Sequence, residues 1–162
     1  FAGHAQVAVH RRDGYEAVGA LLPPASRRGL TLLDPPYESP DEARALARAV
    51  ATALRRFATG MLAVWYPLIE PAQAQALRRQ VRAAAGTAPL VDLTLRVRAA
   101  PGGNGLPGSG MLVCNPPFDL ADTLSPALAA LAARLGDAGA TWGIEPVPVP
   151  TAPRRARPGQ AR

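Results

Sequence analysis

The 162-residue chain has one cysteine, no lysine and no uninterrupted apolar run long enough to span a membrane. A lone cysteine cannot form a disulfide within the chain. Because Cys114 lies in an apolar stretch, we expect a buried, unreactive thiol. No signal peptide is evident, and the lack of a long apolar run predicts no transmembrane helix. These features favour a protein of the reducing cytoplasm.

Clustered metal ligands are missing as well. The two histidines, His4 and His10, stand near the start of the chain without a cysteine or acidic pattern around them. The ligand spacing of zinc sites and the set of groups needed for a serine nucleophile are therefore both lacking. We predict neither a metal site nor a hydrolytic triad.

The charged residues are unbalanced in sign and in type. All 18 basic residues are arginines, against 12 acidic residues, which gives a net charge of +6. Guanidinium groups contact phosphates and stack on bases, so this surface favours a nucleic-acid partner. With 48% hydrophobic residues the chain is globular. Residues 148–162, rich in proline, alanine and arginine, are predicted to form a disordered basic tail.

Strand and helix signals alternate through the first half of the chain. The sequence predicts strands at residues 6–9, 30–33 and 61–66, and helices at 14–22, 39–57 and 72–85. Ser39-Pro40-Asp41-Glu42 has the signature of a helix start, with an N-cap, a proline and a capping-box glutamate. The alternation predicts a parallel sheet with crossover helices.

The pattern changes after residue 88. Strands are expected at 89–97 and 111–114, joined as an antiparallel hairpin that closes the sheet. They are followed by a helix that Asp122 caps and an edge segment at 140–147. Residues 103–108 match G-x-G-x-x-G, but they lie between two strands and open no helix. They are therefore not interpreted as a nucleotide-binding loop.

The strand at 30–33 ends abruptly at Asp34-Pro35-Pro36-Tyr37. Two successive prolines fix φ and remove two backbone donors, so strand pairing must stop there. The corner offers a carboxylate, free carbonyls and an aromatic face at the carboxyl end of an expected central strand, where open α/β sheets bind ligands. A base with an exocyclic amine suits it, because the amine can donate to Asp34 and a neighbouring carbonyl while the ring stacks on Tyr37.

Asn115-Pro116-Pro117-Phe118 repeats this pattern after another apolar strand. The two tetrapeptides have equivalent chemistry, so position must separate them. The second follows a strand expected to run antiparallel, and should therefore lie at the opposite edge of the sheet. We interpret it as a turn that leads into a helix capped by Asn115 or Asp119, and the first as the catalytic corner.

Two further motifs leave alternatives open. Asp13-Gly14 can accept from the amine of a cofactor's adenine and let a ligand approach closely, or Asp13 can simply cap a helix. Trp65-Tyr66-Pro67 ends the strand beside the Asp34 corner. It can form a wall of the base pocket or pack in the core.

Taken together, these motifs resemble the RlmJ-type 23S ribosomal RNA adenine-N6 methyltransferases. The resemblance covers about residues 1 to 135 in order. The matching strings are Asp13-Gly14-Tyr15, Leu22-Pro23-Pro24, Arg27-Arg28-Gly29-Leu30, Leu33-Asp34-Pro35-Pro36-Tyr37-Glu38, Arg56-Phe57-Ala58-Thr59-Gly60, Trp65-Tyr66-Pro67, Gly108-Ser109-Gly110-Met111 and Asn115-Pro116-Pro117.

The resemblance implies methyl transfer from S-adenosylmethionine to the N6 amine of one adenine in 23S rRNA. It implies a cytoplasmic monomer that acts on deproteinised rRNA or an early assembly intermediate. Asp34, Pro35 and Tyr37 would form the catalytic corner, with Tyr37 stacked on the target base. Asp13, Gly14 and Asp34 would contact the cofactor.

The expected fold is the C-terminal half of a Rossmann-like class I methyltransferase. The family's N-terminal half, with its glycine-rich cofactor loop, has no counterpart in these residues. Residues 1–147 are therefore expected to be a partial catalytic domain that binds S-adenosylmethionine poorly by itself. Two alternatives stay open, a DNA adenine methyltransferase and a non-catalytic RNA-binding protein.

Overall fold

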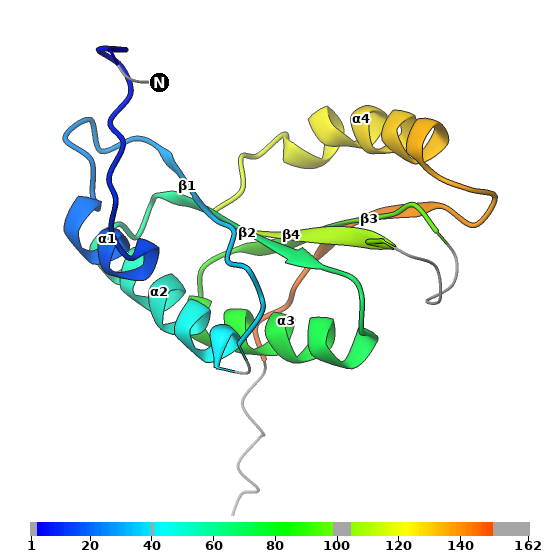
Figure 1. The fold of residues 1–162 in the computed structure, drawn as a ribbon, viewed down its shortest axis with the longest axis horizontal. Helices are drawn as coiled ribbons and strands as arrows, with labels where there is room; N and C mark the ends of the chain where they lie inside the picture. Colours follow the sequence, from blue (N-terminus) through cyan, green and yellow to red (C-terminus); the bar gives the residue numbers. More distant parts are fainter. Residues whose placement is uncertain (1–2, 40, 99–104, 151–162) are drawn as a thin grey trace, which may run out of the picture.

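The computed structural model describes residues 3–39, 41–98 and 105–150. Helices and strands follow one another along the chain (Figure 1). They are α1 (Gly14–Leu21), β1 (Leu30–Leu33), α2 (Glu42–Arg56), β2 (Met61–Pro67), α3 (Pro71–Ala85), β3 (Leu90–Arg96), β4 (Gly108–Cys114), α4 (Leu120–Leu135) and β5 (Thr141–Pro146). The predicted basic tail falls mostly on residues outside the described ranges.

The strands form one mixed sheet in the order β1-β2-β4-β3-β5. Only β1 and β2 pair in parallel, and the three other pairs are antiparallel. The prediction of a parallel sheet is therefore confirmed for β1 and β2 and wrong for the other described pairs. β3 and β4 are antiparallel neighbours, but they do not end the sheet, because β4 inserts beside β2 and β5 adds a further strand outside β3. The expected edge segment is confirmed as β5.

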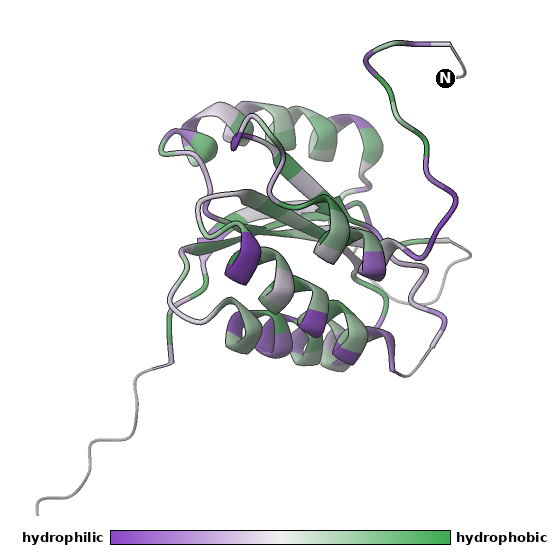
Figure 2. Cartoon of the chain, turned by 90° about the vertical axis from the view of Figure 1, so that its left-hand side faces the viewer, coloured by the Kyte–Doolittle hydropathy of each residue, from purple (hydrophilic) through white to green (hydrophobic). Residues whose placement is uncertain are grey.

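Helices cover both faces of the sheet. Figure 1 shows α1, α2 and α3 on one face and α4 on the other. The main core lies under α2 and α3, whose apolar stripes bury Leu46, Val50, Leu77 and Val81 against the sheet. Figure 2 shows the hydrophilic stretches of these helices alternating with the hydrophobic ones that pack inward.

Two helices begin where the sequence did not place them. The helix N-cap of α2 is Asp41 rather than Ser39, whose hydroxyl instead accepts from the Asp41 amide at 3.2 Å. The capping box fails because the Glu42 carboxylate accepts from a tyrosine of α1. Helix α4 starts after Asp119, so Asp122 lies in its first turn and does not cap it.

The predicted strand at 6–9 is wrong. Residues 6–9 have no regular structure, and Val7 and Val9 are exposed. A strand forms only when its backbone groups pair with a neighbour, and no described strand pairs with this segment.

Strand β1 lies at an edge of the described sheet, and so the expectation of a buried central strand is wrong. Its only described neighbour is β2, and Leu30 and Leu32 are 60% and 56% exposed. Thr31 and Leu33 turn the other way, toward α1. The strand therefore presents one apolar face that the described residues cover only in part.

A polar network is buried in the core. The Tyr66 hydroxyl donates to both carboxylate oxygens of Asp92, at 2.8 and 3.0 Å, and Arg78 forms an ion pair with Asp92 at 2.8 Å. Burial raises the pKa of the Asp92 carboxyl, whereas the Tyr66 hydrogen bond and the Arg78 charge act to lower it. The Tyr66 ring crosses directly over Gly110, where it leaves no room for a side chain.

A buried arginine closes the end of α3. The Arg82 guanidinium donates to the carbonyls of Gly86 and Ala88, at 2.6 and 2.9 Å, and to Val147 at 3.2 Å. Arg82 thus ties the end of the helix to the segment after β5. Cys114 is fully buried nearby, as predicted, and burial raises the pKa of its thiol to about 11. None of the helices in the described ranges has both the length and the apolarity to span a membrane.

Replacing Gly110 with alanine tests the close packing beneath Tyr66. The new Cβ would lie 2.1 Å from the Tyr66 ring, so we expect the free energy of unfolding to fall by about 1–3 kcal/mol. Gly19→Ala is the matched control, because its Cβ meets nothing within 4 Å and alanine favours the α1 helix by up to about 1 kcal/mol. Urea denaturation measures both changes. Equal stability of the two variants would contradict this packing.

Candidate functional site

A pocket of about 860 Å³ lies beside β1 and α1. It extends along β1 into the Asp34 corner and reaches the first turns of α1 and α2. Its lining includes Asp13, Gly14, Tyr15, Val18, Leu30, Leu32, Asp34, Pro35, Pro36 and Glu42. The pocket therefore contains four of the five predicted site residues, and Tyr37 follows immediately after its rim.

The corner is held to the neighbouring strand through Tyr37. The parallel register pairs Leu33 with Val64, so the chain leaves β1 next to the end of β2. Tyr37 has a positive φ of 59°, which a non-glycine residue rarely adopts. In this conformation its hydroxyl donates to the Trp65 carbonyl, and its ring lies 6.2 Å from the Trp65 ring at 51°. The prediction that Trp65 lies beside the corner is confirmed.

The Tyr37 side chain is half-buried and packs against the core. Burial first, and then the nearby Tyr15, Asp34 and Glu42, raise the pKa of its phenol well above the usual range. The hydroxyl therefore stays protonated at neutral pH and remains a donor to the strand. A fixed, neutral ring at this point gives the corner a stable aromatic wall.

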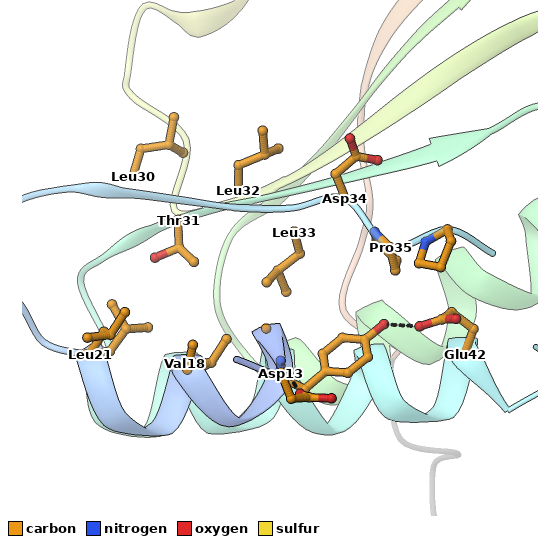
Figure 3. A pocket seen from close by; sticks show the side chains of 15 residues that line it. Asp13, Val18, Leu21, Leu30, Thr31, Leu32, Leu33, Asp34, Pro35 and Glu42 are labelled. Atoms are coloured by element: carbon orange, nitrogen blue, oxygen red, sulfur yellow. Dashed lines mark hydrogen bonds between the residues drawn. The ribbon is translucent and has the colours of Figure 1, made fainter. Parts of the chain in front are cut away.

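Asp34 is exposed and points away from α1. Figure 3 shows its carboxylate on the same side of β1 as Leu30 and Leu32, while Thr31 and Leu33 point to the opposite side. Alternation along a strand produces this arrangement, because residues two apart share a face. One face of β1 thus carries two apolar side chains that lead to a carboxylate at the strand's end.

Asp13 is the N-cap of α1. Its Oδ1 accepts from the amides of Tyr15 and Glu16, at 2.8 and 3.0 Å. The structure therefore confirms the capping interpretation, and it places Asp13 on the pocket wall at the α1 side. Asp34 lies across β1 from it (Figure 3). The two carboxylates line one pocket but face it from different directions.

Sequence reasoning missed the contact between Tyr15 and Glu42. The Tyr15 hydroxyl donates to the Glu42 carboxylate at 2.5 Å, drawn as a dashed line in Figure 3. Burial and then this carboxylate raise the pKa of the Tyr15 phenol. The bond joins the first turns of α1 and α2 at the pocket. A separation of 27 residues gives no local spacing signal, so only the fold brings the pair together.

The second Pro-Pro corner lies at the opposite end of the sheet, as predicted. β4 runs antiparallel to β2, and Cys114 pairs with Leu62 near the start of β2. The side-chain amide nitrogen of Asn115 donates to the carbonyls of Ala58 and Gly60, at 2.8 and 2.9 Å. The expected helix cap is therefore wrong for this side chain. Asp119 occupies the N-cap position of α4, but its side chain makes no capping bond.

Within the part of the chain that the structure describes, no three His, Cys, Asp or Glu side chains gather as a metal site. The polar groups of the pocket are instead carboxylates and phenols. Such groups accept from amines and hydroxyls and lie beside apolar surface. The structure is thus an α/β fold with a pocket at the carboxyl end of β1, the position at which open α/β sheets commonly bind ligands.

The family assignment follows from sequence comparison. Residues 1–147 match the family described as "Ribosomal RNA large subunit methyltransferase D, RlmJ". The chain therefore belongs to the RlmJ family, and the resemblance found in its motifs is confirmed.

Two relatives agree with this assignment. The chain is 37% identical over 131 residues to ribosomal RNA large subunit methyltransferase J of Escherichia coli K12, which covers 81% of the chain and 46% of that protein. It is 35% identical over 146 residues to the Haemophilus influenzae protein of the same name, which covers 90% and 52%. The chain thus spans about half the length of these relatives.

A solved structure supports the fold. The crystal structure of protein LPL1258 from Legionella pneumophila superposes with a TM-score of 0.75 and 29% sequence identity. The match covers 83% of this chain and 49% of that one. The mixed α/β arrangement is therefore shared with a longer protein.

Substitutions at Asp13 separate its cap from any ligand role. Asp13→Ala removes both hydrogen bonds to the α1 amides, so we expect a loss of about 1 kcal/mol in the free energy of unfolding. Asp13→Asn keeps an equally good capping oxygen and should stay within a few tenths of a kcal/mol of the parent. Thermal unfolding followed by circular dichroism tests this. A large loss in the asparagine variant would show that the negative charge itself stabilises the fold.

Proposed function

We propose that the protein transfers a methyl group from S-adenosylmethionine to the N6 amine of an adenine in 23S rRNA. The observation that carries the proposal is the Asp34 corner. An exposed carboxylate is fixed at the end of β1 by two prolines and by the Tyr37 hydrogen bond to β2. Membership of the RlmJ family supports the same reaction.

The residues of the pocket suit this cofactor. Leu30 and Leu32 are more than half exposed and add apolar surface to the pocket lining. Asp13 and Asp34 offer acceptors for amine and hydroxyl donors, and negative charge beside a sulfonium. Gly14 has nothing within 4 Å of the place where a side chain would be, so a ligand can approach the backbone closely. We assign Asp13, Gly14 and Asp34 to cofactor contact.

S-adenosylmethionine supplies an electrophilic methyl group when bound. Asp34 accepts a hydrogen bond from the adenine amine, and the carbonyl of Pro35 accepts a second. These contacts point the nitrogen lone pair at the methyl carbon and stabilise positive charge that grows on nitrogen. The methyl group would pass from sulfur to nitrogen with release of S-adenosylhomocysteine, and the amine proton would then leave to water. The corner thus catalyses by position and electrostatics.

Tyr37 provides the face on which the adenine stacks. Its ring is fixed by the bond to Trp65, so stacking costs little ordering of the side chain. The adenine must be unstacked from its RNA neighbours to reach the corner. Deproteinised 23S rRNA or an early assembly intermediate leaves such a base accessible. We place the reaction in the cytoplasm, by a monomer, on a fold that is half of a Rossmann-like class I methyltransferase.

Asp34→Ala tests the proposal. Methyl transfer is measured with the product of the complete reading frame that encodes these residues, using purified 23S rRNA and detection of N6-methyladenosine by mass spectrometry. Loss of a preorganised charged acceptor should lower the rate about a hundredfold or more. Because Asp34 is exposed, the unfolding midpoint should not change.

Asp122→Ala is the matched control, since it removes an exposed aspartate on α4, and it should retain full activity. An Asp34→Ala enzyme that methylates at the parent rate would contradict the proposal. Methyl transfer to duplex DNA in preference to rRNA would show that the substrate is DNA and would contradict the RNA assignment.

A further inference from the structure

The second Pro-Pro corner carries the most exposed aromatic side chain of the described residues. Phe118 is 104% exposed, so none of its ring surface is covered. A fully exposed phenylalanine is unfavourable in water and commonly marks a binding surface. Pro116 and Pro117 fix the backbone before it, and Asn115 anchors the corner to the loop that precedes β2. The ring therefore projects from a rigid base.

Two pairs of exposed arginines lie at the same end of the sheet. Arg27 and Arg28 precede β1, and Arg55 and Arg56 end α2. The Arg56 Nε donates to the Leu22 carbonyl at 2.7 Å, which holds the loop before β1 against the end of α2. Leu22 begins the loop that carries Arg27 and Arg28, so this bond brings both pairs to one end of the sheet.

Hydrogen bonds also connect this loop to the Phe118 corner. The Met61 amide donates to the Gly29 carbonyl at 3.3 Å, and the neighbouring Gly60 carbonyl accepts from Asn115. Figure 1 shows the loop before β1, the end of α2 and the connection from β4 to α4 at one end of the sheet. This end is opposite to the one that carries Asp34.

The arginine loop is structured. The Arg27 amide donates to the Pro24 carbonyl at 2.9 Å, and the Ser26 hydroxyl donates to the Arg28 carbonyl at 2.9 Å. Arg27 has a φ of 51°, as does Asn115. A positive φ is uncommon for residues other than glycine, although asparagine adopts it more readily than most. The loop that carries the two arginines therefore has a defined backbone conformation.

We propose that this end is a docking surface for single-stranded RNA, which we name the distal surface: Arg27, Arg28, Arg55, Arg56 and Phe118. An unpaired base stacks on Phe118, and the four guanidinium groups contact the flanking phosphates. Two acidic residues, Asp119 and Asp122, follow Phe118 at the start of α4. The positive charge of the surface therefore comes from the four arginines. The charges fit RNA better than an apolar protein partner.

The surface gives the proposed reaction a second point of contact. β1 has four residues, so the distal surface and the Asp34 corner are separated by roughly the length of a short strand, on the order of 13 Å. A few nucleotides span this distance. RNA bound at both ends would hold the target adenine near the corner while its neighbours stay on the distal surface. The inference rests on the proposed function for its substrate, but its binding test does not require catalysis.

The test is the affinity of the 162-residue chain for a fluorescein-labelled, unstructured RNA about 12 nucleotides long, followed by fluorescence anisotropy at several salt concentrations. Phe118→Ala should weaken binding by about fivefold or more, because one stacked base is lost. Arg27→Gln with Arg28→Gln should weaken binding and lower the slope of log affinity against log salt by about 0.7 for each lost contact.

The matched controls remove exposed arginines and an exposed apolar side chain that lie outside the distal surface. Arg48→Gln with Arg79→Gln removes two exposed arginines from the outer sides of α2 and α3, and Leu135→Ala removes an exposed apolar side chain from the far end of α4. Both control variants should bind RNA at close to the parent affinity. Circular dichroism confirms that each variant is folded.

Equal losses in the test and control variants would overturn the distal surface, because binding would then depend on net charge alone. Phe118→Ala that binds RNA normally but abolishes self-association in sedimentation would also overturn it, in favour of a second copy as the occupant. The two proposals can fail separately, because Asp34→Ala should strongly lower methyl transfer without changing RNA affinity. If RNA affinity depends on Phe118 but the parent protein transfers no methyl group, the distal surface is retained and the proposed reaction is rejected.

Discussion

The parallel pairing of β1 with β2 is the constraint on which the site depends. It brings the carboxyl ends of both strands to one edge, where Asp34 leaves β1 and Trp65 lies near the end of β2. The prolines stop the pairing, and the Tyr37 hydroxyl then fixes the turned chain to the neighbouring strand. Without this register the carboxylate, the ring and the pocket would not share one corner.

The same sheet carries two corners of almost identical sequence with different uses. β4 runs antiparallel to β2, so its Pro-Pro corner emerges beside the start of β2, far from Asp34. There the Asn115 side-chain amide donates hydrogen bonds to two backbone carbonyls, whereas the Asp34 carboxylate is exposed. Strand direction, rather than local chemistry, places the two corners at opposite ends of the sheet.

Much of the site was predictable because it depends on local signals. The apolar run that ends at Asp34-Pro35-Pro36 predicted both β1 and the point at which it stops. The apolar stripe that includes Leu46 and Val50 predicted the helix that packs against the sheet. The failures came from long-range pairing. Periodicity could not tell that residues 6–9 lack a partner strand, that β1 lies at an edge, or that Glu42 bonds to Tyr15 instead of closing a capping box. Each depends on what lies beside the residue in space.

The most direct measurement of the central claim is the structure of the complete reading-frame product bound to S-adenosylhomocysteine. We predict that the adenosyl group lies in the pocket against Asp13 and Gly14, and that the sulfur lies beside the Asp34 carboxylate at the end of β1. Cofactor bound at the Asn115 corner, or an Asp34 side chain that turns away from the sulfur, would contradict it.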